Sequence, residues 1–330
     1  RVDMPHRVDH RSMPAIGVVD MRQEAEKQGR PGIFSGVLIE GIRNRLERAE
    51  QTILFLNRRG YASTLMCPSC GTVAECPHCS VSMTVHKARR RLCCHLCGEE
   101  RAIPDRCPKP DCGDPAFKYS GMGTERIEEI LGKLFPGAVV ERVDSDAMRT
   151  KNAYDRVMGA FRTGKIDILI GTQMIAKGLH FPNVTLVGVI FADMALHLPD
   201  FRAGERTFQL LTQVAGRAGR GDVKGEVIVQ TYTPFHPAIQ AARRMDYDGF
   251  CDQELEFRKE LGYPPFTHLV CVSFRGIVEQ EALLTARALR HAVCEELEPL
   301  GFLSEPSPAP IARIQSEYRY QRMLRTRKSR

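Results

Sequence analysis

DILIGTQMIAKG, residues 167–178, is the stretch that decides the fold. Its first half is apolar enough to form a buried β-strand, which we place at residues 166–170. The strand runs directly into Gly171 and Thr172. A loop of this kind presents backbone N–H groups and a hydroxyl, which suit phosphate oxygens. The stretch therefore predicts a buried strand that ends at a phosphate-contacting loop.

Strands and helices alternate on both sides of this stretch. Apolar runs predict strands at residues 52–57, 139–143, 166–170, 184–191 and 226–230. Helical periodicity predicts helices at residues 123–135, 154–161 and 208–218. Alternation of this kind is typical of a parallel α/β sheet.

A second motif, QVAGRAGR at residues 213–220, ends the last of these predicted helices. Arg217 and Arg220 are three residues apart, so on a helix they share one face and can converge on a polyphosphate as arginine fingers do. Alone, such a loop is more often a solvated helix end. Together with the Gly171-Thr172 loop, in this order on one sheet, it favours phosphate binding.

Eight cysteines form four close pairs. They are Cys67, Cys70, Cys76, Cys79, Cys94, Cys97, Cys107 and Cys112. Three pairs have the spacing C-x2-C and the last has C-x4-C, both within the range of zinc knuckles. Four complete pairs make two tetrahedral sites with no position open for water, so we predict two structural Zn²⁺ ions. Spacing alone leaves three pairings of the four pairs open.

Other metal-binding residue types near the pairs are weaker candidates. Three histidines are alternative ligands, although the thiols already fill both sites: His78, His86 and His95. Four cysteines stand outside the C-x2-C register, and we interpret them as buried thiols: Cys93, Cys251, Cys271 and Cys294.

Net charge gives only weak support for a nucleic-acid partner. The chain has 47 Lys and Arg against 40 Asp and Glu, a formal net charge of +7. Two four-cysteine zinc sites would lower this to about +3. Basic runs at residues 87–91 and 325–330 suit DNA contacts and solvated faces equally well. Neither a membrane span nor a signal-peptide pattern is visible, so we expect a cytoplasmic protein.

The lobe that carries both phosphate motifs is predicted at residues 51–66 and 114–234, with a zinc-binding insertion at 67–113. A Pro-rich lead and an amphipathic helix at 38–49 make up residues 1–50 and dock on the sheet.

Beyond the lobe, residues 235–330 predict a small α+β C-terminal domain. Its expected elements are helices at 237–245, 249–261 and 281–297 and a strand at 268–274. Because the chain starts without Met and ends in a charged run, we expect both ends to be cut from a longer protein, which would cut this domain short.

The motifs resemble the second RecA-like lobe of superfamily 2 helicases, whose motifs V and VI match residues 171–178 and 213–220. More closely, most of the chain is similar to the replication-restart helicases of bacteria. Four stretches carry this resemblance most specifically: FLNRRGY (55–61), GMGTE (121–125), GTQMIAKG (171–178) and DFRAGER (200–206). The implied fold is a RecA-like parallel-sheet helicase lobe with an inserted two-zinc module.

The resemblance implies an ATP-dependent 3′-5′ DNA helicase that acts in replication restart and primosome assembly at stalled forks. ATP with Mg²⁺ lies between two lobes in such enzymes, and its hydrolysis ratchets single-stranded DNA. The implied partners are forked or single-stranded DNA, single-stranded DNA-binding protein and other primosome proteins.

The same resemblance implies a role for each motif residue. It implies that four residues contact or lie near the nucleotide and its γ-phosphate: Arg217, Arg220, Gln213 and Gly178. It implies that four other residues contact the DNA backbone: Gly171, Thr172, Gln173 and Lys177. The implied zinc pairing is nested, with Cys67, Cys70, Cys107 and Cys112 on one ion and Cys76, Cys79, Cys94 and Cys97 on the other.

Two departures from the family pattern are visible. The fourth cysteine pair is wider than the usual C-x2-C. His180 stands where many superfamily members carry an Asp near the nucleotide ribose, which leaves that contact open.

GAFRTGKI at residues 159–166 almost spells a P-loop. However, Ile166 replaces the Ser or Thr that binds Mg²⁺, and the stretch precedes a strand instead of following one. No other stretch supplies a Walker A lysine, and Asp193 lacks the acidic neighbour of a Walker B motif. The first motor lobe is missing, so we expect this chain alone to have half an ATP site and little ATPase activity.

Two other functions are open. A non-enzymatic DNA-binding or partner-docking module would use the zinc knuckles as its surface. A zinc-ribbon enzyme of nucleotide metabolism would need an open metal position, against which the four complete pairs argue. Within the insertion, zinc either stabilises a small loop-rich unit or holds a strand-separating or partner-binding surface.

Overall fold

The structure is a computed structural model of the 330-residue chain. It describes all residues except 1–13, 29–31, 57–63, 67–73, 75–76, 78–82, 87–89, 94–98, 108, 113–117, 121–123, 145–146, 149–151, 173–174, 176–180, 193–195, 197–200, 220–224, 298–300 and 328–330. The chain forms two compact units, residues 1–59 with 124–251 and residues 60–123 with 252–330.

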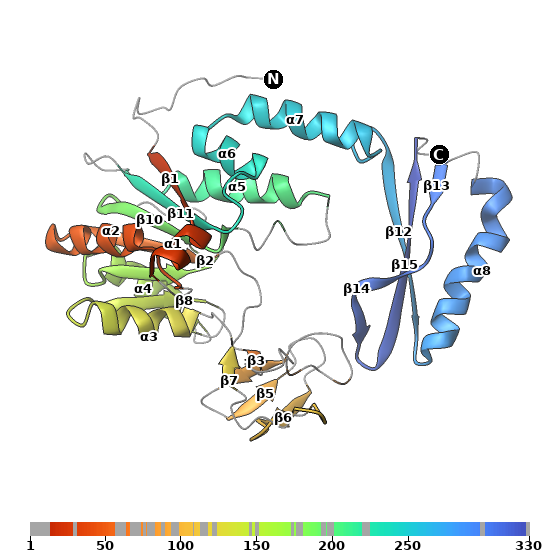
Figure 1. Ribbon diagram of the computed structural model, residues 1–330, viewed down its shortest axis with the longest axis horizontal. Helices are drawn as coiled ribbons and strands as arrows, with labels where there is room; N and C mark the ends of the chain where they lie inside the picture. The colour runs from red at the N-terminus through yellow and green to blue at the C-terminus, as the bar shows by residue number, and fades with distance from the viewer. Residues whose placement is uncertain are drawn as a thin grey trace. The chain divides into compact units, whose positions relative to one another are not determined.

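The first unit is built on a six-stranded parallel sheet with the order β1-β11-β10-β2-β9-β8 (Figure 1). Its strands are β1 (Ala15–Asp20), β2 (Gln51–Leu56), β8 (Val140–Val143), β9 (Ile168–Gly171), β10 (Val184–Ile190) and β11 (Glu226–Thr231). Because β2, β9 and β10 are buried along their whole length, both faces of the sheet are covered.

Helices cover the two faces of this sheet. They are α1 (Met21–Gln28), α2 (Gly36–Glu47), α3 (Thr124–Leu134), α4 (Ala153–Arg162), α5 (Ala203–Ala215) and α6 (Pro237–Arg244). One core cluster joins α4, α5 and α6 to alternate strand positions such as Val187 and Val189. α2 contacts β2 and β10 through Leu38 and Ile42, which are fully buried and lie outside that cluster. Each such side chain stabilises the docked helix by about 1.5–3 kcal/mol.

The strands and helices expected from the sequence are present, with three differences in this unit. The sequence predicts one helix before residue 50, whereas the structure has α1 as well as α2. The sequence does not predict β1, which joins the edge of the sheet as the parallel partner of β11. α5 spans Ala203–Ala215, whereas the sequence predicts 208–218; Gly216 caps its C-terminal end. The domain boundaries inferred from the sequence stay a prediction.

The cysteine region of the second unit contains a five-stranded antiparallel sheet with the order β6-β5-β4-β3-β7. Its strands are β3 (Thr64–Met66), β4 (Thr84–His86), β5 (Arg91–Cys93), β6 (Glu100–Ala102) and β7 (Lys118–Ser120). Strands this short bury little apolar surface, so a sheet of this kind needs additional stabilisation such as a bound metal.

The C-terminal part is an α+β domain, as predicted. α7 (Tyr247–Glu260) leads into it, and its elements are β12 (His268–Gly276), α8 (Glu279–Leu297), β13 (Gly301–Leu303), β14 (Ser307–Ile314) and β15 (Glu317–Thr326). β15 pairs antiparallel with the other three strands, and α8 packs along this sheet (Figure 1). The fully buried Arg322 donates to the carbonyl oxygens of Ser304 and Ala286, which ties α8 to the sheet.

None of the described helices has the length and apolar character needed to cross a membrane.

Candidate functional site

The Gly171-Thr172 loop lies at the carboxyl end of the parallel sheet, as the sequence predicts. Gly171 is the last residue of β9 and pairs in register with Phe55 on β2 and Val143 on β8. Gly171 is buried and Thr172 is half-buried. The other residues that the sequence singles out in this stretch lie outside the described residues: Gln173 and Lys177, predicted to contact DNA, Gly178, predicted to contact the nucleotide, and His180, the departure from the family pattern.

A tight turn explains why a glycine ends this strand. The N–H of Ile175 donates to the carbonyl oxygen of Thr172 at 3.1 Å, and the Ile175 side chain folds back over Gly171. A Cβ added to Gly171 would lie 2.6 Å from Ile175 Cδ1, closer than real Cβ contacts allow. Because Gly171 has no side chain, the loop can close against the strand, and Thr172 lies just beyond the carboxyl end of β9.

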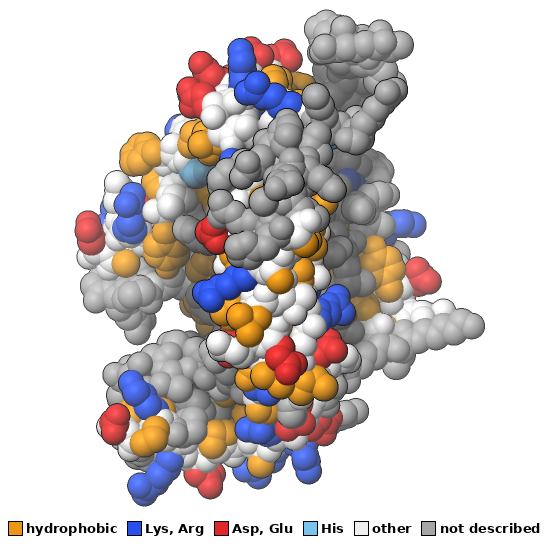
Figure 2. All heavy atoms as spheres, turned by 90° about the vertical axis from the view of Figure 1, so that its right-hand side faces the viewer, with side chains coloured by type: hydrophobic (Ala, Val, Ile, Leu, Met, Phe, Trp, Pro, Cys, Tyr) orange, Lys and Arg blue, Asp and Glu red, His pale blue; other side chains and the backbone are white. Residues whose placement is uncertain are grey.

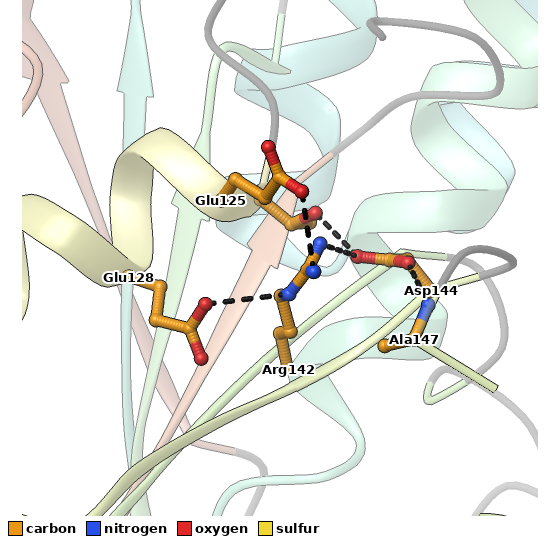
Figure 3. Close-up of polar contacts among 6 residues, drawn as sticks. Glu125, Glu128, Arg142, Asp144 and Ala147 are labelled. Carbon is orange, nitrogen blue, oxygen red and sulfur yellow. Dashed lines mark hydrogen bonds and ion pairs between the residues drawn. The ribbon is translucent and has the colours of Figure 1, made fainter. Parts of the chain in front are cut away.

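A polar network lies at the end of the neighbouring strand, β8 (Figure 3). Arg142 donates to Asp144 at 3.2 Å and to Glu125 at 3.3 Å, and its Nε lies 3.3 Å from Oε2 of Glu128. Burial raises the pKa of Glu128, although the adjacent Arg142 acts to lower it. One guanidinium thus holds three carboxylates from α3 and from the end of β8.

Asp144 connects this network to the start of α3. Its carboxylate accepts the hydroxyl of Thr124 and, at 2.8 Å, the N–H of Ala147. Because Val143 is the register partner of Gly171, Asp144 follows β8 at the same end of the sheet as Thr172. Neither Arg142 nor Asp144 was predicted as a site residue. The signal available in the sequence was a charged residue, Asp144, directly after the predicted strand at 139–143.

We call residues 216–225, which include the end of the second phosphate motif, the arginine loop; the structure describes residues 216–219 and 225 of it. Because α5 ends at Ala215, Arg217 lies in a turn, and its N–H donates to the carbonyl oxygen of Val214 at 2.9 Å. The prediction that Arg217 and Arg220 share a helical face is therefore wrong, because the helix ends before Arg217. Arg220 lies outside the described residues. Gln213 is exposed on the last turn of α5.

The two phosphate motifs lie at opposite ends of the sheet. The N–H of Gly219 donates to the carbonyl oxygen of Val184, the first residue of β10, at 3.1 Å. Gly171 is level with Phe55 and, through it, with Val189, five residues further along β10. At ~3.3 Å per residue, the two ends are about 16 Å apart. Among the described residues, the structure therefore does not bring Gly171 and Thr172 together with Arg217.

The P-loop-like stretch 159–166 has the arrangement that excludes it as a nucleotide site. Its first part is the end of α4, and Lys165 donates its N–H to the carbonyl oxygen of Ala160. β9 then begins at Ile168. A P-loop connects a strand to a following helix, so the order here is reversed.

Of the predicted zinc ligands, Cys107 and Cys112 are within the described residues. The remaining six lie outside them: Cys67, Cys70, Cys76, Cys79, Cys94 and Cys97. Cys107 is buried and Cys112 is half-buried. The N–H of Cys112 donates to the carbonyl oxygen of Lys109 at 3.0 Å, which makes a turn between the two cysteines. A sheltered thiol followed by such a turn fits a metal-binding knuckle.

Strand register shows which strand ends are neighbours in the antiparallel sheet. Met66, the end of β3, is paired with Lys118, the start of β7. Thr84, the start of β4, is paired with Cys93, the end of β5, which is paired in turn with Glu100, the start of β6. β3 and β4 are antiparallel neighbours that pair at Thr64 and Thr84, so the start of β4 is level with the start of β3, two positions from Met66.

The remaining cysteine and histidine predictions have mixed outcomes. Cys271 is exposed on β12, so its interpretation as a buried thiol is wrong. Cys251 is half-buried. The structure does not describe the side chains of Cys93, Cys294, His78, His86 and His95.

The two basic runs are only partly within the described residues. Arg325 donates to the carbonyl oxygen of Leu261 at 2.7 Å and stacks over the ring of Tyr263, so it already has partners. Arg90 and Arg91 are exposed, whereas 87–89 and 328–330 lie outside the described residues. Where described residues form the face in Figure 2, basic and acidic side chains are interspersed.

Three family models match the chain. A model described as helicase conserved C-terminal domain matches residues 119–222, and the PriA DNA helicase Cys-rich region domain matches residues 76–101. The primosomal protein N C-terminal domain matches residues 259–330. Together with the observed sheets, these matches confirm the predicted fold class: a parallel-sheet helicase lobe, a Cys-rich zinc insertion and a C-terminal α+β domain.

Curated relatives align over nearly the whole chain. The replication restart protein PriA of Bacillus subtilis (strain 168) is 47% identical over 324 residues, 98% of this chain and 40% of that protein. The PriA protein of Synechocystis sp. is 42% identical over 98% of this chain and 39% of that protein. The chain thus spans about two fifths of the length of the curated relatives it matches.

A solved structure of RecG bound to a three-way DNA junction matches with a TM-score of 0.39 and 16% identity, over 75% of this chain and 22% of that one. A TM-score this low does not establish a shared fold. The three family models and the near full-length alignments agree with one another. The chain belongs to the family of the replication restart protein PriA.

Proposed function

We propose that the chain forms the second motor lobe, the Cys-rich region and the C-terminal domain of an ATP-dependent DNA helicase that acts in replication restart and primosome assembly at stalled forks, with 3′-5′ polarity. The observation that carries this proposal is the 47% identity over 98% of the chain to a replication restart protein. Forked or single-stranded DNA, single-stranded DNA-binding protein and other primosome proteins are the proposed partners, and the cytoplasm is the proposed location.

The opposite positions of the two motifs support a division of labour within the lobe. At the carboxyl end, the backbone of Gly171 and the Thr172 hydroxyl contact DNA phosphates, together with Gln173 and Lys177. At the amino end, Arg217 and Arg220 reach the γ-phosphate of ATP, with Gln213 near it; Gly178 contacts the nucleotide. Because the two ends are about 16 Å apart, one rigid lobe can hold both ligands at once and couple them as a body.

ATP with Mg²⁺ requires groups that this chain does not supply. Arginines stabilise the charge that develops on the transferred phosphoryl group, but the phosphate-cradling loop and the magnesium carboxylate belong to a first motor lobe. This chain alone therefore has little ATPase activity.

The Cys-rich region holds two structural Zn²⁺ ions in the nested pairing. Cys67 and Cys70 follow β3, and Cys107 and Cys112 precede β7, whose start pairs with the end of β3. The other four cysteines precede β4 or connect β5 to β6, and those strands are neighbours: Cys76, Cys79, Cys94 and Cys97. This adjacency supports the nested pairing over the two alternatives that spacing leaves open. Closed four-thiolate sites stabilise the fold and perform no catalysis.

The test is DNA-stimulated ATP hydrolysis by the full-length protein that carries this chain. Arg217→Ala is expected to lower kcat by on the order of a thousandfold, the effect of losing an arginine finger. Arg43→Ala is the control, because Arg43 lies in an exposed ion pair on α2. Full activity of Arg217→Ala would remove the proposed role of the arginine loop.

A further inference from the structure

Arg45, near the C-terminal end of α2, takes no part in either phosphate motif but lies at the same end of the sheet as the arginine loop. Its Nη2 donates to Oε2 of Glu226 at 2.8 Å, and its side chain is only 13% exposed. Glu226 is the first residue of β11 and comes directly after the arginine loop. The Glu226 side chain is 42% exposed, so solvent partly screens the pair, and the bond acts mainly through the direction that the fixed guanidinium gives it.

Further contacts fix Arg45 in place. Its Nη1 donates to the carbonyl oxygen of Gly41 at 3.5 Å, and its Nε lies 3.9 Å from Oε2 of Glu50. Glu50 also accepts the hydroxyl of Thr185 on β10. The guanidinium and these carboxylates therefore join α2, β10 and β11 at the amino end of the sheet.

The two ends of the arginine loop meet at this junction. The N–H of Gly219 donates to Val184, which precedes Thr185 on β10. Gly225 lies so close to Gly219 that an added Cβ would be 2.3 Å from the Gly219 nitrogen. Gly219 and Gly225 thus lie within a few ångströms of each other at the amino end of the sheet, beside the residue that Arg45 holds.

We infer that Arg45 is a positioning residue for the arginine loop, acting through Glu226. This inference rests on the proposed function, in which Arg217 and Arg220 stabilise the transferred phosphoryl group. Such stabilisation depends steeply on geometry, and a misplacement of about 1 Å costs on the order of a hundredfold in rate. Arg45 touches no substrate in this account. It fixes where β11 begins and so where the loop returns.

The competing explanation is that Arg45 only fastens α2 to the sheet. In that case its variants lower the stability of the protein, but the folded fraction keeps its normal kcat and its normal loop. Readouts of the loop itself are needed to separate the two.

The experiment compares Arg45→Ala with Arg45→Lys, with the exchange Arg45→Glu plus Glu226→Arg, and with Arg43→Ala in the full-length protein. Arg43 is the matched control, since it pairs with Glu40 on the exposed side of the same helix. Arg45→Ala is expected to lower kcat for DNA-stimulated ATP hydrolysis about tenfold, with KM values for ATP and DNA unchanged within about twofold. The Lys variant and the charge exchange are expected to recover part of kcat.

Amide hydrogen exchange supplies the readout that does not depend on activity. In Arg45→Ala, amides of residues 214–228 are expected to exchange faster, while those of the distant turn at residues 172–175 keep their protection. The control Arg43→Ala is expected to change neither segment. If Arg45→Ala does not fold, the Lys variant and the charge exchange carry the comparison.

Each outcome bears on one of the two ideas. Unchanged exchange in residues 214–228 overturns the inference, whether or not kcat falls. Faster exchange with unchanged kcat also overturns it, provided that Arg217→Ala is inactive. If Arg217→Ala stays fully active, the proposed function fails, and faster exchange in Arg45→Ala then supports only the structural link between Arg45 and the loop.

Discussion

The carboxyl end of the six-stranded sheet is held by contacts between near neighbours in the chain, whereas its amino end is held by contacts between distant ones. At the carboxyl end, Gly171, Thr172 and Ile175 close one turn. At the amino end, Arg45 reaches Glu226 across 181 positions of sequence. A local turn forms as soon as its own residues fold, but the amino end exists only when the whole lobe is assembled. Substitutions at the amino end should therefore destabilise the protein more than substitutions at the carboxyl end.

The largest effect is expected from Gly225→Ala, which breaks the amino end. The added Cβ would lie 2.3 Å from the Gly219 nitrogen and 2.4 Å from the Ala218 carbonyl carbon, and backbone atoms cannot move aside cheaply. We expect a loss of about 3 kcal/mol in the free energy of unfolding, measured by urea denaturation. Gly137→Ala is the control, because an added Cβ there meets nothing within 4 Å. Equal stability of the two variants would show that the loop ends are not in contact.

A smaller effect is expected from Gly171→Ala, which breaks the carboxyl end. The nearest atoms are side-chain carbons of Ile175, which can shift, so we expect a loss of about 1–2 kcal/mol. Combining it with Ile175→Ala should cost less than the sum of the two single changes, because the clash is gone. Strict additivity in this double-mutant cycle would exclude the clash as the cause.

The smallest effect is expected from Glu128→Gln, which sharpens the picture of the polar network beside the carboxyl end. Because burial raises the pKa of Glu128, the folded protein keeps this proton at pH values where the unfolded chain has lost it. Stability therefore falls as pH rises from the ordinary Glu range through the folded pKa, and the Gln variant lacks that fall. At pH 7 the variant is expected to be within about 0.5 kcal/mol of the parent or more stable, despite its lost contact with Arg142.

Urea denaturation at pH 4 and pH 7 checks this prediction. Glu129→Gln, in an exposed pair with Arg126 on the same helix, is the comparison variant that removes an exposed carboxylate from the same helix. A clear loss of stability in Glu128→Gln at pH 7 would mean that the ion pair with Arg142 outweighs the cost of burial.

Features set by neighbours in sequence could be predicted, and features set by distant contacts could not. Apolar runs located β2, β9 and β10, because strands buried on both faces are apolar at every position. The Gly171-Thr172 loop was found at a strand end for the same reason. β1 was missed because it is a half-exposed edge strand that exists only through its pairing with β11.

The arginine motif shows the limit of periodicity. Spacing of three predicts a shared helical face only while the helix continues, and Gly216 ends α5 before Arg217. The contact between Arg45 and Glu226 could not be predicted either, because no pattern in the sequence near Arg45 indicates a partner 181 positions away. In the Cys-rich region, spacing identified the ligands but could not pair them; the choice among pairings depends on which strands are neighbours.

The pairing of Thr64 with Ser120 in the small antiparallel sheet has a consequence for chain entropy. The lobe must close a loop from the end of β2 at Leu56 to the start of α3 at Thr124, and a flexible loop of that length carries a closure penalty. With β3 and β7 joined, the length of chain between the lobe and the small sheet is roughly ten residues, and closing so short a loop lowers that penalty by about 1.5 kcal/mol. Whatever holds the insertion together therefore also stabilises the motor lobe by shortening the path that its chain must close.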